Sequence, residues 1–198
     1  WAVSQATPLR RVFIDGDLNL YEYNSGCCAG YSSGGYLSDS TITGTIYSGS
    51  QQQWFTRNSN VANWNGGNWN MVFLGNSGSI PQTHCSNSGG WPITTVAQTP
   101  VIAEKPYLTI NDDGLYSIFV PAIRFNFVGP TTNFTDGIAI DFSNVYVATT
   151  SDTAASINSK LAAGNHLVLT PGIYYLNDTI RVKQANTIVL GIGFPTLV

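Results

Sequence analysis

Residues 152–193 read DTAASINSKLAAGNHLVLTPGIYYLNDTIRVKQANTIVLGIG, a helical pattern followed by short strand patterns. A helix is predicted over about residues 152–163, because Ser151 or Asp152 can serve as its N-cap and Gly164 supplies a C-terminal stop. Its apolar positions fall on one face: Ala154, Ile157 and Leu161. Several β-prone runs follow, separated by turn residues such as Pro-Gly: 166–170, 173–176, 179–182 and 187–190.

The first half of the chain contains the same kind of short strand. The β-prone runs there are residues 12–14, 18–21, 36–37, 41–43, 45–47, 53–56 and 70–74. Many separators are a single Gly or an Asp-Gly pair, too short to reverse the chain into a hairpin, so each strand is expected to bend into the next. Short strands that recur at intervals of roughly 20 residues are typical of a parallel β-solenoid, although a β-sandwich can produce the same pattern.

Two kinds of motif carry a resemblance that favours the solenoid. A helix followed by Pro-Gly-x-Tyr at 171–174 and Thr-x-Val-Leu-Gly-x-Gly at 187–193 resembles the opening coil of right-handed parallel β-helices of the pectate-lyase-like superfamily. SQQQWFTRNS at 50–59 and EKPYL at 104–108 are similar to secreted β-helix proteins of fungi and actinobacteria, some of them labelled adenylyl cyclase. No residue pattern supports nucleotide cyclisation. The resemblance implies an all-β, right-handed parallel β-helix that is part of a longer protein, with the remaining segments of that protein as partners.

The chain is expected to have three parts. Residues 1–76 form a first β-helix segment, and 77–151 form a connecting region of loops and a hairpin with its turn at Asp113-Gly114. Residues 152–198 form the helix and the opening coil of a second β-helix segment.

The charge composition excludes several classes of partner. The 198 residues contain 8 Lys and Arg against 11 Asp and Glu, and only 10% are charged, so the chain cannot neutralise many phosphates of nucleic acid or an anionic membrane. No apolar stretch approaches the roughly 18 residues that a spanning helix needs. Glycosylation sequons at Asn133 and Asn177, with abundant aromatic residues, favour a secreted, extracellular glycoprotein.

The three cysteines favour one disulfide over a metal site. We expect a bridge between Cys28 and Cys85, because both lie in loops rich in Gly, Ser and Asn where a covalent link would help. An adjacent Cys pair with one distant Cys does not match the usual spacing of zinc ligands, so no metal is assigned to them.

The few acids restrict where carboxylate chemistry can occur. Asp15 and Asp17 flank Gly16 and point the same way on an extended segment, and Asp39 lies in the next predicted coil. Coils stacked about 4.8 Å apart could bring them together as catalytic carboxylates of a glycosidase or as ligands of Ca²⁺, the one cofactor left open. Alternatively, all three are coil corners whose carboxylates accept backbone hydrogen bonds.

The aromatic residues indicate sugar binding. Pyranose rings present an apolar face and a rim of hydroxyls, so their sites combine flat aromatic side chains with amides. Trp54, Arg57 and Trp64 are the predicted substrate-binding residues, and Trp64 lies in the run Asn-Trp-Asn-Gly-Gly. The alternative for the tryptophans is the solenoid core, and for Arg57 an ordinary ion pair.

These patterns predict a secreted carbohydrate-active β-helix protein, foremost a glycoside hydrolase of glucan-like polysaccharides. The alternatives are a glycan-binding or cell-wall structural protein without catalysis, and a polysaccharide lyase with a Ca²⁺ site.

Overall fold

The fold is described here from a computed structural model that covers residues 8–24, 28–67, 69–85, 92–132 and 135–198. The chain divides into two units. Unit 1 comprises Trp1–Ile102 and Ile123–Asn133, and unit 2 comprises Ala103–Ala122 and Phe134–Val198. The connecting region expected at 77–151 is therefore shared between the units.

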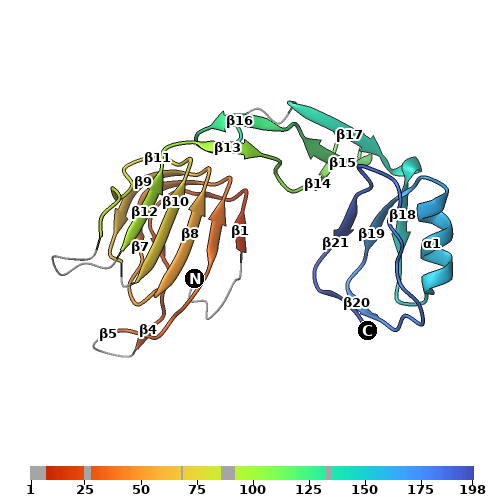
Figure 1. Cartoon of the computed structure of the whole chain (residues 1–198), viewed down its shortest axis with the longest axis horizontal. Coiled ribbons are helices and arrows are strands. Elements are labelled where there is room, and N and C mark those ends of the chain that lie inside the picture. Colours follow the sequence, from red (N-terminus) through yellow and green to blue (C-terminus); the bar gives the residue numbers. More distant parts are fainter. Residues whose placement is uncertain (1–7, 25–27, 68, 86–91, 133–134) are drawn as a thin grey trace. The chain divides into compact units, whose positions relative to one another are not determined.

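Unit 1 is a parallel β-helix with two sheets (Figure 1). Sheet A contains, in spatial order, β1 (Pro8–Arg10), β6 (Tyr36–Ser38), β8 (Gln53–Arg57), β10 (Asn70–Leu74) and β12 (Ile93–Val96). Sheet B contains β2 (Phe13–Ile14), β3 (Leu18–Asn19), β7 (Thr41–Tyr47), β9 (Asn60–Asn65) and β11 (Ser77–Gly78). All neighbours within each sheet are parallel, and the chain alternates between the sheets, so the predicted parallel β-helix is confirmed.

Two antiparallel pairs complete unit 1. The hairpin of β4 (Tyr23–Asn24) and β5 (Cys28–Ala29) lies between β3 and β6 in the sequence, and β13 (Thr99–Ile102) pairs with β16 (Arg124–Phe127).

Strands β8 and β10 of sheet A show strict alternation of buried and outward side chains. In β8, Trp54 and Thr56 are buried, whereas Gln53, Phe55 and Arg57 are exposed or half-buried. The inward side chains of both sheets form one apolar cluster: Leu18, Leu20, Leu37, Ile42, Ile46, Trp54, Val61, Trp64, Met71, Phe73 and Ile93. One face of sheet A is thus covered by the core, and the other faces outward.

A column of left-handed residues turns the chain from sheet A into sheet B. Arg11, Asp39, Asn58 and Gly75 have φ of 52°, 51°, 45° and 61°, a region that Asn, Asp and Gly tolerate best. The backbone N–H of each donates to the carbonyl at the end of the strand one coil further on. Asp39 is therefore a corner residue, as one of the two sequence interpretations holds.

Unit 2 combines an antiparallel sheet with parallel coils. The antiparallel sheet contains β14 (Tyr107–Ile110), β15 (Tyr116–Pro121) and β17 (Gly137–Asp141). The parallel pairings join β18 (Val145–Ala148), β19 (His166–Leu169) and β21 (Val189–Gly191), and also β20 (Gly172–Tyr174) with β22 (Pro195–Leu197). The helices are the short 3₁₀ helix η1 (Phe142–Asn144) and α1 (Ala154–Ala162). The hairpin with Gly114 in its turn, at φ 79°, is confirmed.

The predicted helix forms, with a different N-cap. Ala154, Ile157 and Leu161 are its buried residues, as expected. Thr153 caps it: the Thr153 hydroxyl accepts from the Ser156 N–H, and Ser156 Oγ accepts from the Thr153 N–H. Asp152 instead accepts from the backbone N–H of Thr149, so it closes the turn before the helix. Within the described residues, no helix is long and apolar enough to cross a membrane.

Two other local expectations are wrong. Residues 179–182 do not form a strand, because Asn158 of α1 binds the Thr179 carbonyl at 2.8 Å and the Arg181 N–H at 2.7 Å. The Cys28–Cys85 disulfide is absent, because Cys85 is a free, exposed thiol. Cys28 is itself part of a disulfide bond, so its sulfur is not available to Cys85.

Candidate functional site

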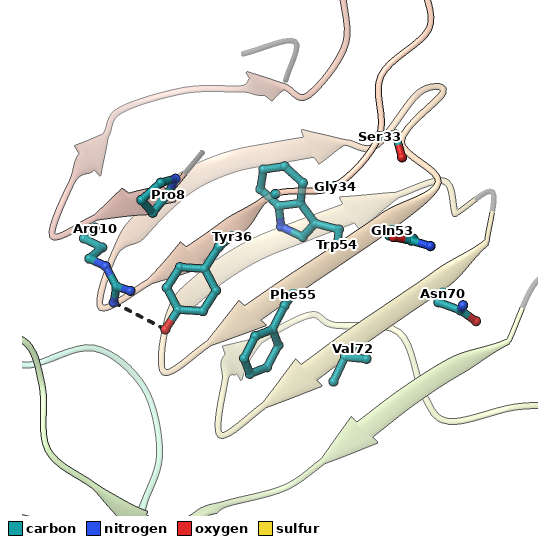
Figure 2. Close-up of a pocket in the computed structure, with 11 residues that line it drawn as sticks. Pro8, Arg10, Ser33, Gly34, Tyr36, Gln53, Trp54, Phe55, Asn70 and Val72 are labelled. Carbon is teal, nitrogen blue, oxygen red and sulfur yellow. Dashed lines mark hydrogen bonds between the residues drawn. The ribbon is translucent and has the colours of Figure 1, made fainter. Parts of the chain in front are cut away.

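A groove on the outer face of sheet A is the candidate site. It has a volume of about 760 Å³ and is open to solvent. Its lining side chains come from β1, β6, β8 and β10 and from the segment before β6 (Figure 2). The lining residues are Pro8, Arg10, Ser33, Gly34, Gly35, Tyr36, Gln53, Trp54, Phe55, Asn70 and Val72.

Tyr36 and Phe55 form an aromatic platform in this groove. They are direct partners in the register between β6 and β8, and their ring centroids lie 5.3 Å apart at 57°. Because β strands alternate their side chains, outward positions in neighbouring coils align, which places both rings on the same face. Val72 continues this row in β10.

Two guanidinium groups hold the Tyr36 ring. Arg10 of β1 lies 4.5 Å and Arg57 of β8 lies 5.8 Å from its centroid. Arg10 Nη1 also donates to Ser38 Oγ at 3.0 Å and to the Tyr36 hydroxyl at 3.4 Å, the latter drawn in Figure 2. The cation–π and hydrogen-bond contacts fix the orientation of Tyr36 before any ligand arrives.

Amide side chains mark the other end of the groove. Gln53 and Asn70 are register partners in β8 and β10, and both are exposed. Figure 2 shows them beside Ser33, away from Arg10. This end therefore offers neutral donors and acceptors, whereas the Arg10 end offers charged donors.

Trp54 borders the groove from within. It is only 3% exposed, and its Nε1 donates to Thr56 Oγ1 at 3.1 Å. A Cβ built on Gly35 would lie 2.0 Å from the Trp54 ring, so glycine is required for the close approach of the β6 segment. Trp54 supports the platform from the core and offers little face to a ligand.

Of the other two predicted sugar-binding residues, Arg57 lies near the groove and Trp64 lies in the core. Arg57 does not line the groove itself, but its guanidinium lies over the ring of Tyr36, which does. Trp64 lies in β9 and is 8% exposed, with Nε1 donating to the Gly66 carbonyl and its ring 4.8 Å from Phe73. The Asn-Trp-Asn run is thus a strand with its indole in the core, and Trp64 presents no face to a sugar.

The three predicted catalytic acids do not converge. Asp15 accepts from Thr43 Oγ1 at 2.9 Å, and Asp17 accepts from the Thr45 N–H at 2.7 Å, both on β7. Asp39 is buried, accepts from the Thr131 N–H at 2.6 Å and lies 3.8 Å from Arg11. Four extended residues, about 13 Å, separate Asp39 from the partner of Asp15. A catalytic role for these acids stays a prediction, and their contacts are those of turns and an ion pair.

The described ranges also contain no group of three or more His, Cys, Asp or Glu residues that could hold a metal ion. Asp15, Asp17 and Asp39 thus do not gather into such a group, and Ca²⁺ binding by them stays a prediction.

Among the described residues that line the groove there is no carboxylate; the groups that it presents are aromatic rings, amides and a guanidinium. Sequence reasoning missed Tyr36, Phe55, Gln53, Asn70 and Arg10 as one site. The available signal was the outward position of each residue in its strand, but the register that joins the strands is not local information.

Comparisons with known proteins agree with this architecture. Residues 145–198 match the model of the LAM55 pectate lyase-like domain. The chain is 40% identical to an exo-beta-1,3-glucanase of Streptomyces sp. (strain SirexAA-E / ActE). The match covers 100% of this chain and 32% of the length of that protein. The solved structure of sacteLam55A from Streptomyces sp. SirexAA-E matches with a TM-score of 0.89 and 41% identity, covering 100% of this chain and 35% of that one.

A variant of that protein in complex with glucose matches with the same TM-score and identity, over 34% of its length. The chain thus spans about a third of the length of the relatives it matches. The pectate-lyase-like β-helix expected from the motifs is confirmed at this level.

Proposed function

We propose that this chain is part of a glycoside hydrolase that acts on β-1,3-glucan, and that the groove on sheet A binds the glucan. The observation that carries the proposal is the 40% identity, over the whole chain, to an exo-beta-1,3-glucanase. The remaining segments of the parent protein are then its partners, and a polysaccharide is its substrate.

The groove has the groups that a neutral sugar chain requires. Tyr36 and Phe55 offer an apolar surface on which the C–H face of a pyranose can stack. Gln53 and Asn70 can exchange hydrogen bonds with equatorial hydroxyls, and Arg10 can donate to ring or linkage oxygens. The platform is held by Arg10 and Arg57 in the free protein, so little ordering entropy is lost on binding.

Hydrolysis needs a second set of groups. Glycosidases use an acid and a nucleophile or base, both carboxylates, on either side of the scissile bond. None of the described residues that line the groove is a carboxylate, and Asp15, Asp17 and Asp39 are occupied in turns and an ion pair. We therefore place the catalytic carboxylates in other segments of the parent protein, and expect the 198-residue chain alone to bind glucan without cleaving it.

The test is sugar release from β-1,3-glucan by the parent protein, measured as reducing ends. A Phe55→Ala variant should raise KM about tenfold by loss of stacking, whereas Phe125→Ala, an exposed aromatic outside the groove, should leave KM unchanged. No release from β-1,3-glucan would contradict the hydrolase proposal. Asp15→Asn should retain activity within about twofold, and a loss above a hundredfold would restore Asp15 as a catalytic acid.

A glycan-binding protein without catalysis is the second candidate, because the groove has aromatic and amide groups and no acid. Saturable binding of β-1,3-glucan by the parent, together with no release of sugar, would favour it.

Secretion and N-glycosylation belong to the same proposal. Asn177 and Thr179 of one sequon are exposed and outside regular secondary structure, so a glycan there meets no packed neighbour. The sequon at Asn133 lies outside the described residues. In a eukaryotic secretory host, enzymatic deglycosylation should lower the mass of the chain, and Asn177→Gln should remove the Asn177 share of that loss; an unmodified Asn177 peptide would contradict it.

A further inference from the structure

Tyr31 is a solvent-exposed aromatic residue, two positions before the groove-lining Ser33. It is 98% exposed, the highest value among the large apolar and aromatic side chains of the described residues. It follows the β4–β5 hairpin and precedes Ser33, Gly34 and Gly35, which line the groove.

The backbone on both sides of Tyr31 is fixed. Gly30 donates its N–H to the Glu22 carbonyl and accepts from Ser50 Oγ. Ser32 is 4% exposed, and its Oγ lies 3.0 Å from Ser50 Oγ. Ser50 belongs to the corner between β7 and β8, so the Tyr31 backbone is anchored to the solenoid wall while its ring is free of contacts that would bury it.

The position of Tyr31 relative to the groove follows from the chain. Ser33, two residues later, lies at the amide end with Gln53 and Asn70 (Figure 2). Two residues span at most about 7 Å, so the Tyr31 backbone lies within about one sugar ring of Ser33. The segment 31–35 therefore connects an exposed ring to the groove by a short, pinned path.

We propose that Tyr31 forms an additional sugar-binding subsite, which stacks on a glucosyl residue of a β-1,3-glucan chain extending past the amide end of the groove. The inference rests on the proposed function, since it takes the groove occupant to be glucan. Anchoring of Gly30 and Ser32 removes the backbone part of the ordering cost on binding, and a tyrosine ring has only two χ angles to order. The subsite contributes only to sugars long enough to reach it.

The test compares a short and a long β-1,3-gluco-oligosaccharide, a disaccharide and a hexasaccharide, by calorimetric titration of the 198-residue chain. Tyr31→Ala should weaken binding of the hexasaccharide about five- to tenfold and leave the disaccharide affinity unchanged. Tyr31→Trp should retain the hexasaccharide affinity, because stacking needs a ring and not the hydroxyl. Tyr175→Ala, which removes a 76% exposed ring from unit 2, is the matched control and should change neither affinity.

The outcomes separate the two proposals. Unchanged hexasaccharide affinity in Tyr31→Ala, or an equal loss for both sugars, overturns the Tyr31 subsite while the groove proposal stands. Failure of the wild-type chain to bind either sugar overturns glucan binding in the groove, and the subsite with it.

Discussion

Sheet A of unit 1 and the parallel sheet β18–β19–β21 of unit 2 are the same kind of structure with different surroundings. In β8 and β10, buried and half-buried residues alternate, so one face packs on the core and the other meets solvent. In β19, Leu167, Val168 and Leu169 are all buried. Leu167 and Leu169 pack with α1 and Tyr174, and Val168 packs with Ile118 of β15 and Leu190 of β21.

The number of covered faces determines whether a parallel sheet can present side chains to a ligand. A parallel sheet covered on both faces reads as a continuous apolar run, whereas one with a free face alternates. The second face of β18–β19–β21 is used for packing against the antiparallel sheet, whereas sheet A keeps a face on which aromatic and amide side chains can meet a ligand.

Truncation inside the doubly covered sheet should have the largest effect. Leu167→Ala, at 1% exposure, should lower the free energy of unfolding by about 3 kcal/mol through lost burial and a residual cavity. Leu115→Ala, at 63% exposure in the β14–β15 turn, is the matched control and should cost less than about 0.5 kcal/mol. Chemical denaturation measures both, and equal losses would contradict the packing difference.

The corner of unit 1 should come next. Asn58 is 1% exposed; its Nδ2 donates to the Gly75 and Phe127 carbonyls, and its Oδ1 accepts from Thr99 Oγ1 at 2.8 Å. Asn58→Ala leaves these groups unpaired. It also places alanine, which tolerates the left-handed region less well than asparagine, at φ 45°. The free energy of unfolding should therefore fall by about 2 to 3 kcal/mol.

Asn186→Ala separates the two causes of that loss. Asn186 also has a positive φ, 62°, but is exposed, so its replacement should cost only about 1 kcal/mol of backbone strain. Equal losses at Asn58 and Asn186 would mean that the buried hydrogen bonds of the corner contribute nothing.

The smallest effect concerns acid sensitivity of unit 2. Burial raises the pKa of Asp152, but hydrogen bonds from the Thr149 backbone, Tyr146, Ser156 and the Thr149 hydroxyl outweigh it and hold the pKa below its usual range. The same hydrogen bond from the Tyr146 hydroxyl raises the pKa of Tyr146. A carboxyl with a lowered folded-state pKa stabilises the fold above the unfolded value near 4, and loses that contribution as pH falls through the folded pKa.

Asp152→Asn should therefore reduce the dependence of unfolding free energy on pH below about pH 4, relative to the wild type. Asp178, whose pKa is lowered by hydrogen bonds from Arg181 and Thr179, is fully exposed, so Asp178→Asn should change the profile less. Denaturation curves between pH 3 and 6 measure this, and superimposable wild-type and Asp152→Asn profiles would contradict it.

Much of the fold was accessible from the sequence because its signals are local. The face of α1 with Ile157 and Leu161, the turn at Gly114 and the short strands with their Gly and Asp separators depend on residues within one turn or one strand. The strand expected at 179–182 does not form, because the Asn158 side chain makes hydrogen bonds to backbone groups of this segment.

The site was less accessible because it depends on register between coils. Aligned residues are spaced 28 apart from Pro8 to Tyr36, 19 from Tyr36 to Phe55 and 17 from Phe55 to Val72, so no fixed period brings them together. Asp39 and Asp15 were expected to converge from neighbouring coils, but Asp39 lies at a corner, whereas Asp15 follows β2 and binds Thr43 of β7. Residue type alone could not separate corner acids from catalytic ones.

The most direct test of the account is a titration of the ¹⁵N-labelled 198-residue chain with a β-1,3-gluco-hexasaccharide, followed by amide chemical shifts. If the uncovered face of sheet A is the binding surface, saturable shifts will occur at Tyr36, Gln53, Phe55 and Asn70, and amides of β18 and β19 will not move. Shifts concentrated in unit 2, or no saturable shift in sheet A, would contradict it.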